Sequence, residues 1–149
     1  MRDPAADAAA ALLPPGTEPE VLAVIWATVD TERVLAGIDL PADELPDDEL
    51  LGASVRLIRP PDEAPIALLE PRTDARLAGT LARHGEGPAG RYVVAADGLA
   101  HVARRAAAAG IAVSRPEDGP FGAEVLVLAD ATAGPHLLLV ERPAGTIEP

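Results

Sequence analysis

Residues 24–30 spell VIWATVD, and residues 91–97 spell RYVVAAD. Each stretch is an apolar, strand-like run that ends in an aspartate and leads into a helical pattern. Two more echoes follow in the same order: GASV at 52–55 with GAEV at 122–125, and ALLE at 67–70 with LLVE at 138–141. The offsets are 67, 70 and 71 residues, so the spacing is kept as well as the order. An internal repeat of this length predicts two copies of one supersecondary unit.

Each copy is expected to run strand, helix, then strands. In the first copy we expect strands at 21–29, 53–59 and 66–70 and helices at 31–37 and 73–84, with a loop over the acidic, proline-containing residues 39–50. In the second copy we expect strands at 90–96, 111–114, 123–129 and 136–141 and a helix over 98–110. The predicted fold class is α+β. Two tandem βαβββ modules form curved, mostly antiparallel sheets around a cleft, with helices on the convex side.

The predicted domain organisation has four parts. Residues 1–18 form a flexible tail, 19–84 the first βαβββ module with its linking helix, 85–142 the second βαβββ module, and 143–149 a tail. A cleft where two such modules meet is the natural place for a binding site.

Composition narrows the class of protein. The chain has 149 residues, 48% of them hydrophobic, and it contains one Trp, one Tyr and one Phe, so Ala, Val, Leu and Ile must build the core. Its formal charge of −12 argues against binding nucleic acid through phosphate neutralisation. No cysteine is present, which excludes disulfides, thiolate metal sites and a cysteine nucleophile. A small-molecule ligand is the expected partner.

The N-terminal region carries no membrane or export signal that we can identify. Residues 8–13 are apolar, but this run is too short to span a membrane. Asp3 and Asp7 stand where a signal peptide would carry positive charge. We therefore expect a cytoplasmic protein with no membrane partner.

The repeat and its motifs resemble the vicinal oxygen chelate superfamily, which includes glyoxalase I, methylmalonyl-CoA epimerase, extradiol dioxygenases and bleomycin-type resistance proteins. Three motifs, residues 69–71 (LEP), residues 85–87 (GEG) after the helix from Thr73, and the closing pair Val140 and Glu141, are similar to the epimerase-like branch. The resemblance covers about residues 20–142. It implies a homodimer, since small curved sheets leave edges and apolar surface to cover. The cleft then forms within one chain or between two.

The metal chemistry of that family is not expected here. The resemblance places the four metal-ligand positions at Ala23, Ala67, Gly90 and Leu138, and none of these side chains can donate to a metal ion. The neighbouring positions, 22–24, 66–68, 89–91 and 137–139, hold no His, Asp, Glu or Gln either. The catalytic carboxylate of the epimerase branch falls near Val55. We expect no metal and no other cofactor, with the four matched residues lining the site and contacting the substrate.

The alternation of side chains along each strand predicts which polar residues face the cavity. If Gly90 faces the cavity, Tyr92 does too, and if Leu138 faces it, so does His136. A neutral imidazole can act as a base near pH 7, and a phenol can donate to a developing oxyanion. His136 and Tyr92 are therefore the catalytic candidates. The other interpretation of His136 is a half-exposed residue at the start of an edge strand.

The roles of several other polar residues have more than one interpretation. Arg56 shares a face with Ser54, and this face either points into the cavity, where Arg56 clamps an anionic group of the substrate, or into solvent. His84 and Glu86 lie at a helix end, where a catalytic role is an alternative to helix capping. Glu70 and Glu141 occupy equivalent places in the two repeats, and strand parity favours a structural role for both.

Two classes of function fit these features. The first is a metal-independent enzyme, an isomerase, lyase or cyclase acting on a small carbonyl or acyl compound, in specialised metabolism. The second is a small-molecule-binding protein without catalysis, such as an antibiotic-sequestering resistance protein. Such proteins usually stack flat ligands on aromatic rings, which are scarce in this chain. That shortage favours the enzyme, or a ligand that is aliphatic.

Overall fold

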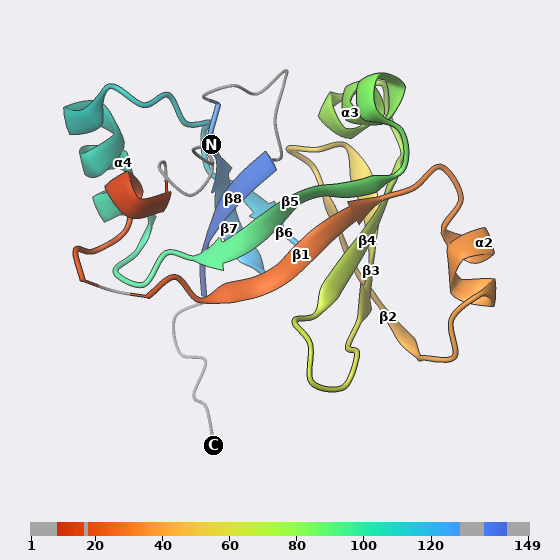
Figure 1. Cartoon of the computed structure of the whole chain (residues 1–149). Coiled ribbons are helices and arrows are strands. Elements are labelled where there is room, and N and C mark those ends of the chain that lie inside the picture. The colour runs from red at the N-terminus through yellow and green to blue at the C-terminus, as the bar shows by residue number, and fades with distance from the viewer. Residues whose placement is uncertain (1–8, 17, 129–135, 143–149) are drawn as a thin grey trace.

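The structure is a computed structural model that describes residues 9–16, 18–128 and 136–142 (Figure 1). The expected C-terminal tail, 143–149, lies outside the described residues. So do residues 1–8 and 17 of the expected N-terminal tail and residues 129–135, which connect the last two strands.

Eight strands of the described chain form one curved sheet. The first module contributes β1 (Val21–Ala27), β2 (Ala42–Asp48), β3 (Ala53–Ile58) and β4 (Ile66–Pro71). The second module contributes β5 (Gly87–Val94), β6 (Glu117–Gly119), β7 (Gly122–Leu126) and β8 (His136–Glu141). The order across the sheet is β2-β3-β4-β1-β5-β8-β7-β6, so the two modules have the same internal order. They join through the antiparallel pair β1 and β5, and the expected two sheets are therefore one.

The register confirms the internal repeat. In the first module Ile25 pairs with Ala67 in the parallel ladder between β1 and β4. In the second module Tyr92 pairs with Leu138 in the parallel ladder between β5 and β8. These two pairs are related by the same 67- and 71-residue offsets that relate the sequence motifs. The α+β fold class and the paired βαβββ modules are confirmed.

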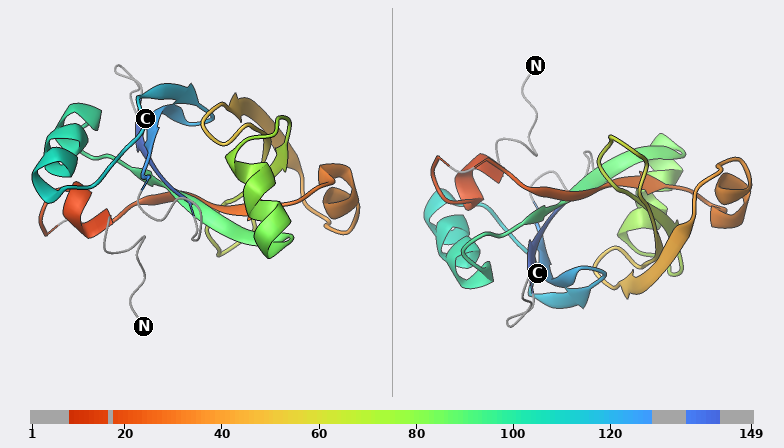
Figure 2. Two further views of the ribbon diagram at one scale, coloured as in Figure 1. Left: turned by 90° about the horizontal axis from the view of Figure 1, so that it is seen from above. Right: turned by 90° about the horizontal axis from the view of Figure 1, so that it is seen from below.

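The sheet curls until its two end strands, β2 and β6, come into contact, which gives a near-barrel (Figure 2). Alternate residues of each strand point inward and form the inner core. This core consists of small and aliphatic side chains with one Tyr: Ala23, Ile25, Ala27, Leu51, Ala53, Val55, Leu57, Ala67, Leu69, Leu77, Ala89, Tyr92, Leu126, Leu138 and Val140.

The helices that accompany the sheet in the described residues include α2 (Thr31–Ala36), α3 (Arg76–His84) and α4 (Leu99–Ala109). Helix α4 covers the outer face of the second module, as expected, with Val102 and Ala106 buried against the sheet. Helix α3 differs from the expectation, because Leu77 joins the inner core and the helix covers one end of the barrel (Figure 1). Among the described residues, no helix is both long and apolar enough to cross a membrane.

Three segments differ from the sequence interpretation. The expected loop at 39–50 contains β2, because an edge strand tolerates Pro46 and a row of exposed acids. The expected strand at 111–114 is reduced to a single bridge between Val113 and Val127, and β6 provides the edge strand instead. The expected helix at 73–84 begins only at Arg76.

Part of the expected N-terminal tail is packed. Residues 9–12 are helical, and Leu12 and Leu13 are buried against the same outer core as α4. An apolar run of Ala and Leu gives this turn a face to bury, although it lies before the first strand.

Candidate functional site

A buried polar cluster lies inside the otherwise aliphatic barrel. Tyr92 on β5 is fully buried, and its hydroxyl donates a 2.7 Å hydrogen bond to Oδ2 of Asp48 at the end of β2. The backbone N–H of Leu51 donates to the other oxygen of Asp48 at 2.9 Å. The Tyr92 ring also packs edge-on against Phe121, with centroids 4.9 Å apart. Burial, followed by the charge of Asp48, raises the pKa of Tyr92 well above its usual value, so the phenol keeps its proton.

Glu124 on β7 is the second acid of this cluster. Its side chain has no solvent exposure, and neither carboxyl oxygen receives a hydrogen bond from the described residues. Burial, followed by the neighbouring carboxylate of Asp48, raises the pKa of Glu124 to about 10. Glu124 is therefore a neutral acid at pH 7.

His136 begins β8 and is 3% exposed, which rules out the half-exposed interpretation. Its Nε2 lies 2.7 Å from Oγ1 of Thr80 on α3. Burial, then the charge of Arg76, lowers the pKa of His136, while Asp48 opposes this effect. The ring is therefore neutral near pH 7.

The hydroxyl of Thr80 has two partners. Its Oγ1 lies 3.1 Å from the backbone carbonyl oxygen of Arg76, to which it can only donate, and 2.7 Å from Nε2 of His136, where donor and acceptor depend on the tautomer of the ring. When the hydroxyl proton goes to Arg76, Oγ1 accepts from Nε2–H, and Nδ1 is then the ring nitrogen able to accept a proton.

Comparison with solved structures identifies the architecture. Methylmalonyl-CoA epimerase from Streptomyces coelicolor, in complex with 2-nitronate-propionyl-CoA, is 21% identical, with a TM-score of 0.71 over 89% of this chain and 100% of that chain. Methylmalonyl-CoA epimerase from Mycobacterium tuberculosis is 20% identical, with a TM-score of 0.70 over 90% and 95%. A hypothetical protein from Bacillus halodurans is 16% identical, with a TM-score of 0.70 over 89% and 100%.

The chain has the vicinal oxygen chelate fold. No protein-family model matches the sequence, and no curated protein matches it. At these identities the likeness concerns the fold, and the chemistry must be argued from this chain's own residues.

The residues at the metal-ligand positions of this fold do not fit a metal. Ala23, Ala67 and Leu138 are apolar and fully buried in the inner core. Gly90 has a φ of +147°, and a Cβ built there would overlap the backbone carbonyl of His136, so this backbone admits no ligand side chain. Within the described part of the chain, no three His, Asp or Glu side chains are grouped to hold a metal ion.

These four residues were also expected to line the site and contact the substrate. Ala23, Ala67 and Leu138 have no solvent exposure, and their contact with a substrate stays a prediction. The epimerase-branch base position, Val55, is buried in the same core. Tyr92 and His136 do face inward as strand alternation predicts, and their catalytic roles remain a proposal.

Arg56 does not point into the barrel. Val55 and Leu57 belong to the inner core, so Arg56 lies on the outer face, where its guanidinium contacts Glu32 at 3.1 Å. It lines an outer groove of about 180 Å³ with Ser54 and other polar residues. Of the two interpretations left open by the sequence, this outer position favours the solvent-facing one over a clamp inside the barrel.

The turn at His84 and Glu86 serves the fold. One carboxylate oxygen of Glu86 accepts from the hydroxyl of Thr28 at 2.6 Å, from the backbone N–H of Val29 at 2.9 Å and from Arg33 at 2.5 Å. These donors, Thr28 first, lower the pKa of Glu86 to about 2. Glu86 therefore ties the start of the second module to the loop before α2.

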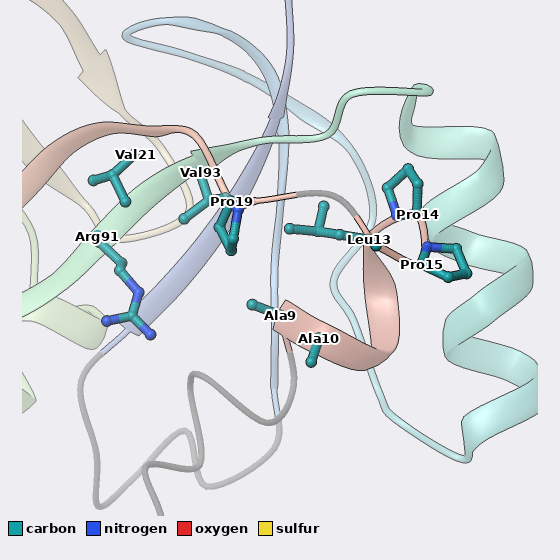
Figure 3. A pocket seen from close by; sticks show the side chains of 10 residues that line it. Ala9, Ala10, Leu13, Pro14, Pro15, Pro19, Val21, Arg91 and Val93 are labelled. Atoms are coloured by element: carbon teal, nitrogen blue, oxygen red, sulfur yellow. The ribbon is translucent and has the colours of Figure 1, made fainter.

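A separate apolar pocket of about 420 Å³ lies on the outer face (Figure 3). It is bounded by the N-terminal helical turn and the proline-rich segment after it on one side, and by Val21 and Val93 of the sheet on the other. Arg91 of β5 is the charged residue in its lining. This pocket is on the opposite side of the sheet from Tyr92.

Sequence reasoning missed Asp48, Glu124 and Thr80. Glu124 carried a signal, since it is the one charged residue in the apolar run 122–128. Asp48 carried none, because it is one of six acids in residues 39–50, and the other five are at least partly exposed to solvent.

Proposed function

We propose that this protein is a metal-independent enzyme of the vicinal oxygen chelate fold, an isomerase, lyase or cyclase acting on a small carbonyl or acyl compound. One observation carries the proposal: a neutral imidazole and a proton-bearing phenol lie in the buried interior, where the positions that the resemblance matches to metal ligands are apolar. Low dielectric strengthens polar interactions with a reacting group. Specialised metabolism remains the proposed setting, and the cytoplasm the proposed location.

Each group has a distinct role. Nδ1 of His136 removes a proton from carbon next to the carbonyl group, and a neutral ring is the form that can do so. The hydroxyl of Tyr92 exchanges its bond with Asp48 for one with the developing oxyanion. Ala23, Ala67 and Leu138 form the apolar wall against which the substrate lies. Gly90 keeps the adjacent backbone close to His136.

A comparison suggests which substrate class to test first. Two of the three solved structures described above are methylmalonyl-CoA epimerases. We propose acyl thioesters as the first class to test, with 2-oxo acids as the second. Both have carbon-bound hydrogens made acidic by a neighbouring carbonyl.

The test is hydrogen exchange in D2O. Methylmalonyl-CoA, propionyl-CoA and pyruvate are each incubated with the protein, and deuterium incorporation is followed by mass spectrometry. We expect exchange with at least one of them, lowered by about 10²-fold or more in His136→Ala. Tyr92→Phe should lower it less, because water partly replaces the phenol. His101→Ala, which removes an exposed imidazole on α4, is the control and should keep the wild-type rate. No exchange with any of the three compounds contradicts the proposal.

The alternative is a small-molecule-binding or resistance protein without catalysis. The outer apolar pocket of about 420 Å³ favours it, since this volume suits a small ligand. In that case ligand binding is detected without exchange. If the ligand contacts the interior polar groups, removing either His136 or Tyr92 weakens binding by about 1–3 kcal/mol.

We also propose a homodimer. Val21, Val24 and Trp26 of β1 are 37–40% exposed on the sheet, which is unusual for large apolar residues at the centre of a fold. Sedimentation equilibrium should give twice the 15.3 kDa chain mass, and Trp26→Lys should shift the protein towards monomer. A wild-type monomer at all concentrations contradicts this.

A further inference from the structure

The two buried acids, Asp48 and Glu124, lie where the sheet closes on itself. Asp48 is the last residue of β2, and Glu124 is on β7, next to β6. β2 and β6 are the two ends of the sheet, and they are in contact without being paired in the strand order (Figure 2). Among the described strands, no ladder hydrogen bonds join β2 and β6, so side-chain contacts such as the hydrogen bond between Tyr92 and Asp48 hold this seam together.

The carboxyl group of Glu124 lies against a glycine of the neighbouring strand. A Cβ built on Gly119 of β6 would overlap the carboxyl group of Glu124. Glycine at this position therefore lets the acid lie flat against the edge strand. Val125, the next residue, belongs to the outer core, which leaves Glu124 facing inward with Leu126.

Asp48 and Glu124 differ in the hydrogen-bond donors around them. Asp48 accepts from Tyr92 and from the backbone of Leu51, which stabilises its anion. Glu124 has no donor among the described residues. A buried carboxylate without donors is costly, which favours the protonated form of Glu124 beside Asp48. The other groups that act on this region are Tyr92, the neutral His136, and Arg76 of α3.

We propose that Asp48 and Glu124 share one proton and that Glu124 is the general acid that complements His136. This inference deepens the proposed function and rests on it. An isomerase needs one group to remove a proton and another to return one, and a buried neutral acid is suited to the second task.

The proton transfers balance. His136 takes the proton from carbon, the C–H bond breaks, and its electron pair moves to the carbonyl oxygen as an enolate. Glu124 then gives its proton to the enolate, a new C–H bond forms, and the pair is left as two carboxylates. The charge of the interior stays constant, because the imidazolium formed on His136 offsets the second carboxylate. When His136 returns its proton to the pair after product leaves, the starting state is restored.

Glu124→Gln separates this inference from the proposed function. Glutamine keeps the size of the side chain and a donor towards Asp48, but it cannot release a proton. With one epimer of methylmalonyl-CoA in D2O, we expect Glu124→Gln to keep exchange at the starting configuration, which needs only His136. Formation of the other epimer should fall by about 10²-fold or more. Glu117→Gln changes an exposed acid of β6 that pairs in register with Glu124, and it should behave as wild type.

The outcomes are distinct. Wild-type protein that exchanges none of methylmalonyl-CoA, propionyl-CoA and pyruvate overturns the proposed function. Exchange by the wild type together with an unchanged rate of epimer formation in Glu124→Gln overturns the role of Glu124 alone.

A second measurement needs no substrate. Infrared spectra at pH 7 should show the carbonyl stretch of a buried protonated carboxyl group, absent in Glu124→Gln and present in Glu117→Gln. If wild type lacks this band, the shared proton is refuted.

Discussion

Glu70 and Glu141 perform the same structural task in the two modules. Oε1 of Glu70 accepts from the backbone N–H of Thr31 at 2.7 Å, at the start of α2. Oε1 of Glu141 accepts from the backbone N–H of Leu99 at 2.8 Å, at the start of α4. In each module the last strand thus caps the helix that follows the first strand, and it supplies a negative charge at the positive end of that helix.

Removing either cap should destabilise the protein. We expect Glu70→Ala and Glu141→Ala each to lower the free energy of unfolding by about 1 kcal/mol, the usual cost of a lost helix cap. The two effects should add, because the two sites share no partner. Urea denaturation of the single and double variants provides the measurement, with Glu117→Ala as an exposed control. If Glu70→Ala and Glu141→Ala cost no more than the control, the capping role is wrong.

Gly90 should tolerate no side chain. In Gly90→Ala the new methyl group meets the backbone of His136 at a φ that disfavours L-residues, so we expect a loss of about 1–3 kcal/mol or more. Gly79→Ala is the matched control, since Gly79 lies inside α3 with open space around it. This control should gain about 0.5–1 kcal/mol, the usual preference for alanine in a helix. Equal thermal stability of the two variants would show that β5 and β8 can separate at this point.

The repeat made the fold predictable, and the edges of the sheet escaped prediction for a physical reason. A central strand such as β1 buries one face, which leaves a strong apolar signal in the sequence. The end strand β2 has Leu45 and Asp48 as its inward side chains, and its remaining residues are one alanine, one proline and three acids. Its pattern is therefore that of a loop. Pairing with β3 imposes the extended conformation.

The site was only half predictable. Strand parity placed Tyr92 and His136 inward because each lies one alternation from a matched position. Parity also left Arg56 ambiguous, and only the packing of Val55 and Leu57 resolves it. The partnership of Asp48 with Tyr92 depends on closure of the sheet, which brings β2 towards the second module and has no local signature.

Purified protein should hold no stoichiometric metal. Ala23, Ala67 and Leu138 offer no donor atoms, and the backbone at Gly90 offers no space for one. Elemental analysis after dialysis should therefore find far less than one equivalent of Zn, Mg, Mn, Fe, Co or Ni per chain. About one equivalent, retained by wild type and lost in Asp48→Asn or His136→Ala, would show that the interior cluster binds a metal after all.

The shared proton between Asp48 and Glu124 has a direct thermodynamic signature. Glu124 has a pKa of about 10 when folded and an ordinary value near 4.5 when unfolded, so the folded protein binds one proton more between these limits. Its contribution to stability is fully present below pH 4.5 and is lost as the pH rises towards 10. The measurement is the free energy of unfolding by urea between about pH 7.5 and 9, above the titration of His136. We expect wild type to lose up to about 1.4 kcal/mol per pH unit relative to Glu124→Gln. Parallel curves for the two proteins would contradict the account, because Glu124 would then be ionised in the folded interior.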